Sequence, residues 1–269
     1  MLTVRFEGSM IALAVFLSLA AAPAARAAEA PAPAAEVDCL KCHAALTVRM
    51  KVVHAAVQMG CPSCHSGIAE ALKVPHKKTN TVAKGLSAEQ PDLCYGCHDK
   101  SKFTKKNVHA AVGMGCTGCH NPHANNNEKL LVAPVPDLCF NCHDKAEFSR
   151  KNVHAPVAGG MCLSCHDPHS SDNYALLVKP AYTVCTECHD AVPKSPHAMA
   201  GFGSKGHPLG MPKKERKGKK PTEELKDPKR EGKPFTCASC HNPHSSDFAR
   251  LYRYPAKSPM ELCSNCHKY

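Results

Sequence analysis

Cysteine and histidine recur along this chain in one fixed arrangement: two cysteines separated by two residues, with a histidine directly after the second. All 18 cysteines of the 269-residue sequence fall in nine such Cys-x-x-Cys-His motifs, and none is left over. Thiols and imidazoles at this spacing can form disulfides, hold zinc or attach an iron porphyrin. The motifs are Cys39–His43, Cys61–His65, Cys94–His98, Cys116–His120, Cys139–His143, Cys162–His166, Cys185–His189, Cys237–His241 and Cys263–His267.

The three chemistries differ in what else they require. A disulfide framework gives no reason for a histidine after every second cysteine. A zinc site needs a second ligand pair at a restricted separation, whereas the gaps between these motifs vary from about 20 to about 50 residues. Two thiols three positions apart can instead form thioethers with the two vinyl groups of a porphyrin, and the adjacent histidine then binds the iron. We therefore predict nine covalently bound haem c groups.

This interpretation assigns a role to every cysteine and to half of the 18 histidines. The thioethers are expected at Cys39, Cys42, Cys61, Cys64, Cys94, Cys97, Cys116, Cys119, Cys139, Cys142, Cys162, Cys165, Cys185, Cys188, Cys237, Cys240, Cys263 and Cys266. The proximal iron ligands are expected to be His43, His65, His98, His120, His143, His166, His189, His241 and His267.

Nine further histidines lie outside the motifs, which is the number that nine haems with two histidine ligands each would require. These candidate distal ligands are His54, His76, His109, His123, His154, His169, His197, His207 and His244. Their positions repeat with the motifs, which favours a ligand role over nine unrelated surface or core histidines.

An internal repeat of about 45 residues organises the chain. The second and third units, which align most clearly, each contain a haem motif, the sequence "VHA", a second haem motif, a "PH" dipeptide and an apolar "LL", and the fourth has "PHA" at His197 and "NPH" at His244. The predicted two-haem units cover residues 38–91, 92–136, 137–182 and 183–259, and residues 260–269 form a half unit. The first unit lacks the adjacent "PH", and His76 in "VPH" is the candidate replacement.

His123 lies only three residues after His120, and Pro122 restricts the backbone between them. Two histidines so close cannot easily bind opposite faces of one iron. We therefore expect His123, and with it His169 and His244, to bind a neighbouring haem. Either His197 or His207 could serve the fourth unit or the terminal haem at Cys263.

The expected fold is mostly irregular with short α-helices and almost no sheet. There is no tryptophan, the chain has only 8 phenylalanines and 6 tyrosines, and 22 prolines limit long helices. Porphyrins rather than side chains would fill the interior, and units that contact mainly their neighbours would form an elongated array.

The first 37 residues are typical of an export signal followed by a tether. Arg5, the apolar run from Met10 to Ala20 and small residues around Ala27 are typical of a cleaved signal peptide, expected over 1–27. The alternative is a retained anchor. Residues 28–37 are rich in alanine and proline and predict a disordered tether, before a nonahaem domain over 38–269. No further apolar run predicts a transmembrane segment in the mature chain.

Residues 213–233 form a basic insertion between the two motifs of the fourth unit, with ten basic and five acidic residues. It is expected to be a solvated, mobile loop; the alternative is a docking arm for an acidic partner or anionic lipid. The formal net charge of +11 would be largely offset by haem propionates. Nucleic acid is therefore not an expected partner.

With these motifs in place, the sequence resembles the doubled-CxxCH family of bacterial multihaem cytochromes. That family includes the periplasmic decahaem cytochromes of porin–cytochrome conduits and the pentahaem donor to nitrite reductase. The resemblance rests on "CHNPH", "CHDPH" and the "VHA" spacing, and it covers Cys39 to Tyr269. Nine haems rather than ten or five, the irregular first unit and the basic insertion depart from those relatives.

The resemblance implies bis-histidine haems, an elongated shape and electron transfer without substrate chemistry. An exported carrier would be periplasmic, or docked in an outer-membrane porin. Its expected donor is an inner-membrane quinol dehydrogenase or a small cytochrome, and its acceptor a terminal reductase, a porin or an outer-membrane cytochrome. The alternative is a multihaem nitrite, hydroxylamine or tetrathionate reductase, which requires one iron with an open position.

Overall fold

A computed structural model describes residues 37–192 and 226–268. The expected signal peptide at 1–27, all but the last residue of the tether at 28–37, and both His197 and His207 lie outside these ranges. The described elements from Asp38 onward belong to one unit.

The helices are short, as the sequence predicts. Six are α-helical: α1 (Leu40–His43), α2 (Asp92–Tyr95), α3 (Asp137–Phe140), α4 (Ala155–Ala158), α5 (Ala181–Thr186) and α6 (Pro259–Cys263). The longest of these in the described residues is α5, with 6 residues. In that same part of the chain, no helix has the length and apolar character needed to cross a bilayer.

Single 3₁₀ turns provide most of the remaining regular structure. They are η1 (Ala44–Leu46), η2 (Ala55–Met59), η3 (Cys61–Ser63), η4 (Ala83–Gly85), η5 (Lys100–Phe103), η6 (Ala110–Met114), η7 (Cys116–Gly118), η8 (Glu128–Leu130), η9 (Lys145–Phe148), η10 (Cys162–Ser164), η11 (Tyr174–Leu176), η13 (Cys237–Ser239) and η14 (Ala249–Leu251). Such turns are normally brief because their hydrogen-bond geometry is poorer than that of an α-helix.

The sheet in the described residues consists of antiparallel pairs of two-residue strands. The strands are β1 (Val52–Val53), β2 (Ile68–Ala69), β3 (Lys77–Lys78), β4 (Asn107–Val108), β5 (Ala124–Asn125), β6 (Asn152–Val153), β7 (Ser170–Ser171) and β8 (Ser245–Ser246). They pair as β1–β5, β2–β3, β4–β7 and β6–β8. The expectation of little sheet is confirmed, although it did not include these small ladders.

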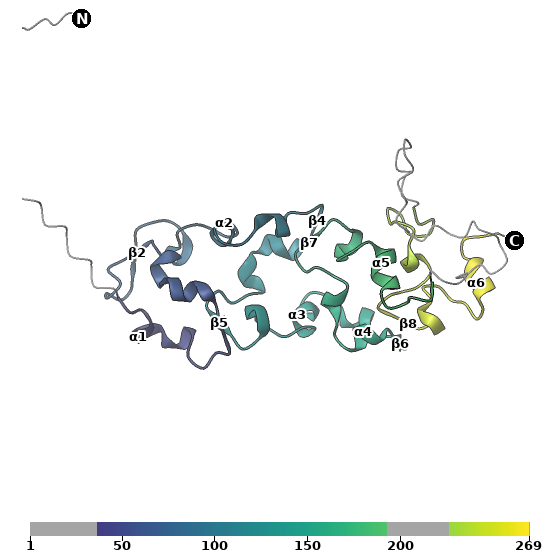
Figure 1. Cartoon of the computed structure of the whole chain (residues 1–269), viewed down its shortest axis with the longest axis horizontal. Helices are drawn as coiled ribbons and strands as arrows, with labels where there is room; N and C mark the ends of the chain where they lie inside the picture. The colour runs from purple at the N-terminus through teal and green to yellow at the C-terminus, as the bar shows by residue number, and fades with distance from the viewer. Residues whose placement is uncertain (1–36, 193–225, 269) are drawn as a thin grey trace, which may run out of the picture. The chain divides into compact units, whose positions relative to one another are not determined.

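The ladders join consecutive units of the repeat. β4 precedes the "VH" histidine of the second unit, and β7 follows the "PH" histidine of the third; their register pairs Asn107 with Ser171 and Val108 with Ser170. The β1–β5 and β6–β8 ladders have the same relation, and Figure 1 shows β4 beside β7 and β6 beside β8. Neighbouring units are therefore linked through their backbones.

The first unit closes on itself instead. Strand β3 follows His76, as β5, β7 and β8 follow their "PH" histidines, but its partner is β2 of the same unit. Residues 1–37 contain no Cys-x-x-Cys-His motif, and the backbone groups that pair with a preceding unit elsewhere are satisfied here within a local hairpin.

Local sequence explains where the turns begin. Asp99 and Asp144 each directly follow a motif histidine, and each carboxylate accepts a hydrogen bond from a backbone N–H at the start of η5 or η9, at 3.0 and 2.9 Å. Acidic side chains are favoured at this capping position. Before η7, Gly115 has a φ of +93°, a conformation that disfavours residues with a Cβ.

Few side chains are buried. The most buried described positions, Ala124 (1% exposed), Ser170 (0%) and Ser245 (0%), all directly follow a "PH" histidine and begin β5, β7 and β8. The buried side chains of the described residues therefore lie in two kinds of place, at the junctions between consecutive units and around the Cys237–His241 motif, and most of them are small or polar.

The end of the basic insertion differs from the expected solvated loop. Residues 213–225 lie outside the described part of the chain, but Lys226–Lys233 forms a tight turn in which Asp227 is only 6% exposed. The Asp227 carboxylate accepts backbone hydrogen bonds from Lys229 (2.9 Å) and Arg230 (3.1 Å) and an ion-paired bond from Arg230 Nε at 2.7 Å.

Candidate haem sites

Each of the nine motifs folds as a single helical turn. In every motif the histidine N–H donates to the carbonyl of the first cysteine, at 2.9 to 3.0 Å. Residues at i, i+3 and i+4 of such a turn share one face. The spacing thus places two thiols and an imidazole side by side, as covalent attachment and ligation of one porphyrin require.

The two motifs within a unit lie against each other through their first cysteines. Thiol contacts join Cys94 with Cys116 and Cys139 with Cys162. Burial and the bond with Cys116 raise the pKa of the Cys94 thiol to about 11. The equivalent contacts in the first and fourth units are Cys39–Cys61 and Cys185–Cys237.

The second motif of each unit is also close to the first motif of the next. Cys64 and Cys119 are near enough to raise the pKa of Cys94 and Cys139, respectively. The same relation holds between Cys165 and Cys185, and between Cys240 and the pair Cys263 and Cys266. All nine motifs therefore form one uninterrupted series from Cys39 to Cys266.

The proximal histidines of the second motifs are oriented by a repeated left-handed turn. His120 Nδ1 lies 2.8 Å from the carbonyl oxygen of Lys129, whose φ is +53°. His166 makes the same bond to Ala175 (φ +55°) at 2.9 Å. In these two units the turn contains the "LL" sequence. When Nδ1–H donates its hydrogen bond to such a carbonyl, the other ring nitrogen, Nε2, remains free to bind iron.

Equivalent bonds occur in the first and fourth units. His65 Nδ1 lies 3.0 Å from the Lys84 carbonyl, and His241 Nδ1 lies 2.9 Å from that of Arg250. Sequence reasoning recognised the apolar pair as a repeat marker but not as the source of these acceptors.

The "VH" histidines are held by the following unit. His109 Nδ1 lies 2.9 Å from the carbonyl of Pro168, and its backbone N–H donates to His169 at 2.9 Å. His54 and His154 have the same Nδ1 contacts with Pro122 and Pro243, at 2.9 and 3.0 Å. The proline of each "PH" dipeptide thus orients a histidine of the unit before it.

Proximal and candidate distal histidines face each other in pairs across the described residues. The ring centroids of these pairs are 5.9 to 6.1 Å apart. The seven pairs are His43–His76, His54–His98, His65–His123, His109–His143, His120–His169, His154–His189 and His166–His244.

This separation fits a metal ion between the two rings. Imidazoles that bind one ion from opposite sides at about 2 Å must have centroids about 6 Å apart. Direct ring stacking would be closer, and five of the pairs are near parallel, with interplanar angles of 14 to 23°. The His43–His76 and His166–His244 pairs are tilted by 51 and 44°.

Six of the seven pairs cross from one unit to the next. A "VH" histidine faces the first motif of the following unit, as His109 faces His143. A "PH" histidine faces the second motif of the preceding unit, as His169 faces His120. His76 departs from both rules, because it faces His43 of its own first motif.

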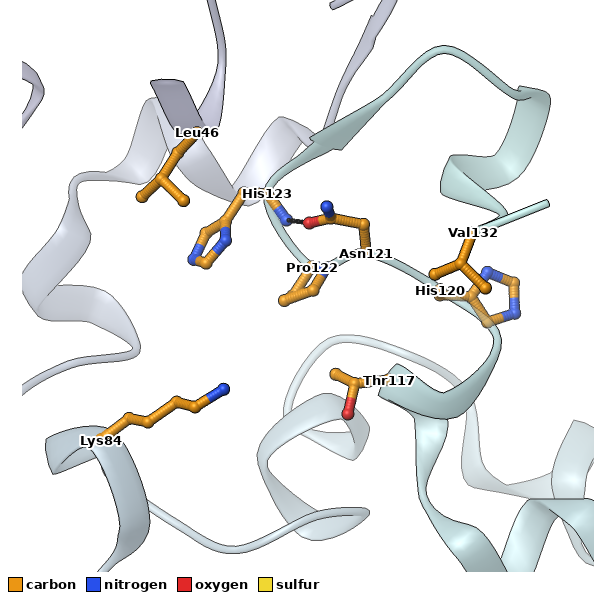
Figure 2. Close-up of a pocket in the computed structure, with 8 residues that line it drawn as sticks. All are labelled: Leu46, Lys84, Thr117, His120, Asn121, Pro122, His123 and Val132. Atoms are coloured by element: carbon orange, nitrogen blue, oxygen red, sulfur yellow. Dashed lines mark hydrogen bonds between the residues drawn. The ribbon is translucent and has the colours of Figure 1, made fainter. Parts of the chain in front are cut away.

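Figure 2 shows the rings of His120 and His123 at opposite ends of their short segment. The Asn121 Oδ1 atom accepts a hydrogen bond from the His123 N–H at 3.0 Å, which fixes the turn between them. The segment borders a cavity of about 410 Å³ whose lining residues are Leu46, Lys84, Thr117, His120, Asn121, Pro122, His123 and Val132. This space adjoins the His65–His123 pair.

The "PH" histidines are partly buried. Burial lowers the pKa of His123, His169 and His244 below the usual histidine value. Phe103 packs edge-on against the ring of His169, with centroids 4.9 Å apart, and Phe148 contacts His244 at 4.8 Å. Sequence reasoning missed both phenylalanines, although they occupy the same position in successive units.

The described residues contain no cluster of three or more histidine, cysteine or acidic side chains able to hold a metal ion. The remaining two proximal histidines, His241 and His267, also have contacts with neighbouring groups.

A model of the doubled CXXCH motif matches the chain four times, at residues 54–103, 109–148, 154–194 and 227–269. The first three matches begin at a "VH" histidine and end beyond the first motif of the next unit. No curated protein matches the chain.

Proposed function

This chain belongs to the doubled CXXCH motif family, and from that premise we propose that it carries nine haem c groups, each ligated by two histidines. Its paired motifs identify it as a multihaem c-type cytochrome that acts in electron transfer. The finer proposal concerns haem number, ligation, location and partners.

The observation that carries the proposal is the set of seven histidine pairs with ring separations of 5.9 to 6.1 Å. The pairing assigns a distal histidine to each of the first seven motifs. When bound, haem c supplies an iron that accepts and releases one electron. Two imidazoles on each iron would leave no position for a substrate, which favours a carrier over a reductase.

The chain's own residues set the spacing and orientation of the sites. Backbone carbonyls such as those of Lys129 and Pro168 fix the rings of His120 and His109 through Nδ1. Contacts between cysteines of successive motifs keep each attachment point next to the following one. We propose that electrons pass from site to neighbouring site along this series, with the porphyrins filling most of the interior.

The last two motifs complete the ligand set through His197 and His207. By the repeat rule, the "PHA" histidine His197 takes the "VH" role and serves the following motif, that of His267. No "PH" follows the fourth unit, so His207 would serve His241 as His76 serves His43. Both assignments rest on the repeat, because these two histidines lie outside the described residues.

The cellular setting follows from the export signal and the family. We propose that the protein is periplasmic, either as a free shuttle or docked at an outer-membrane porin. The donor would be an inner-membrane quinol dehydrogenase or a small cytochrome, and the acceptor a terminal reductase, a porin or an outer-membrane cytochrome.

Electron paramagnetic resonance of the fully oxidised protein tests this function, with haem number measured by intact mass. Nine haems and entirely low-spin signals are expected, because every iron would have two histidine ligands. A high-spin signal equivalent to one haem would overturn the carrier proposal and favour a reductase with an open site. A mass without covalent haem would overturn the haem assignment altogether.

A further inference from the structure

The eighth motif, Cys237–His241, is more enclosed than its counterparts. Ser239, inside the motif, is 5% exposed, whereas Ser63, Gly118 and Ser164 at the same position of the other second motifs are exposed. Phe235, Thr236 and Tyr252 pack around it, each at most 9% exposed. Charges near this motif therefore act through less solvent, which strengthens their effect.

One residue beside each second motif has a constant backbone role. Its N–H donates to the carbonyl of the motif's second cysteine, at 2.8 to 2.9 Å, and the four residues are Ser87, Val132, Val178 and Arg253. Only the fourth carries a charge. The chain thus contains three natural neutral counterparts of Arg253 at an equivalent position.

The Arg253 guanidinium donates hydrogen bonds to two carbonyls of the motif itself. Nε donates to the Ala238 carbonyl at 2.7 Å, and Nη2 donates to the carbonyl of His241, the proximal ligand, at 3.2 Å. Asp227 forms an ion pair with Arg230, with 2.7 Å between Arg230 Nε and Asp227 Oδ2. The local balance of Asp227, Arg230 and Arg253 is therefore one positive charge held against the motif.

We propose that Arg253 raises the reduction potential of the haem at Cys237–His241 above those of the haems at Cys116–His120 and Cys162–His166. This inference rests on the proposed function. Reduction transfers one electron from an external donor to the ferric iron, and the site loses one positive charge. A fixed cation next to the proximal ligand disfavours the ferric state more than the ferrous state, so it favours reduction. Electrons would therefore reside at the eighth motif in preference to the fourth and sixth.

A spectroelectrochemical titration of the full haem-loaded protein, with Arg253→Val, tests this role. About one-ninth of the reduced α-band amplitude should shift to lower potential. The equilibrium constant for reduction of that haem should fall at least tenfold, which corresponds to about 59 mV for one electron. The rest of the curve should not move. Arg253→Lys, which retains the charge, should keep the wild-type curve. Superimposable curves for wild type and Arg253→Val would overturn the proposal.

The reciprocal variant Val178→Arg keeps the test decisive if Arg253→Val loses its haem. It places a guanidinium at the equivalent position of the sixth motif, and about one-ninth of the amplitude should shift upward. No upward shift in a variant with nine haems by mass would also overturn the role of this position. Failure of the proposed function is distinguishable, because wild-type protein would then lack covalent haem or show a high-spin iron.

Discussion

The ring of Phe103 packs edge-on against that of His169, which in turn faces His120 of the preceding motif pair at 5.9 Å. Tyr95 also contacts Phe103, with ring centroids 5.7 Å apart. Phe103 belongs to the second unit and His169 to the third. The orientation of a candidate axial ligand thus depends on an aromatic side chain from the neighbouring unit.

Replacing Phe103 with leucine should loosen the His169 ring without removing it. An edge-to-face aromatic pair contributes about 1 kcal/mol beyond the area it buries. We expect the free energy of unfolding to fall by about that amount, and one low-spin signal in the electron paramagnetic resonance spectrum to shift or broaden. Phe148→Leu should act likewise through His244, and an unchanged spectrum for both variants would contradict this role.

Ligation across units can be located with cysteine variants. In His169→Ala, one haem should become high-spin, because its iron loses its distal ligand. Adding Cys116→Ala and Cys119→Ala should abolish that high-spin signal, since these cysteines would attach the affected haem. Cys162 and Cys165 belong to the motif nearest to His169 in sequence. Adding Cys162→Ala and Cys165→Ala instead should leave the high-spin signal in place. The reverse pattern would show that His169 serves its own motif.

Two levels of this structure differ in how far the sequence predicts them. The turn of each motif follows from its spacing, because i, i+3 and i+4 share a face whatever the surroundings. The sequence also predicts that the "PH" histidines bind a neighbouring haem, but it does not predict which neighbour, because that depends on which unit each strand pairs with. His76 illustrates the difference: the sequence marks it as a substitute for the missing "PH", yet its ring faces His43 because β3 folds back on β2.

The buried serines at the unit junctions were likewise not identified from the sequence. Their environment comes from a neighbouring unit: Ser170 Oγ donates to the Lys102 carbonyl at 2.8 Å and accepts from the Lys105 N–H at 3.2 Å. Small polar residues after a "PH" read as ordinary turn residues until that neighbour is in place.

Ser170→Ala should therefore destabilise the junction, but only modestly. The loss of a buried hydrogen-bonded hydroxyl costs about 1 kcal/mol. The first junction shows how the backbone can compensate: Ala124 occupies the equivalent position, and the Met50 N–H donates directly to the Thr47 carbonyl at 3.2 Å. Denaturant unfolding of the haem-loaded protein measures the change, with Ser245→Ala as its counterpart. A loss well above 3 kcal/mol would mean that this compensation fails.

Acid should weaken the turn that holds the eighth motif. Burial alone would raise the pKa of Asp227, but hydrogen bonds from Ser239 and Arg230 outweigh it, so the pKa lies below the ordinary value of 3.8. A carboxyl group with a lowered folded-state pKa stabilises the protein above its unfolded pKa, and this contribution disappears as pH falls through the folded value. Asp227→Asn should thus be less stable than wild type at neutral pH.

The difference between the two proteins should shrink as pH falls from about 5 to about 2, because wild type loses the contribution of Asp227 over that range. Thermal unfolding at a series of pH values measures this convergence. Glu128→Gln removes an exposed carboxylate. As a control, its unfolding temperature should differ from that of wild type by the same amount at every pH. If the difference in unfolding temperature between Asp227→Asn and wild type is also the same at every pH, the charge of Asp227 does not stabilise the fold. The turn at Lys226–Lys233 would then depend on its backbone hydrogen bonds alone.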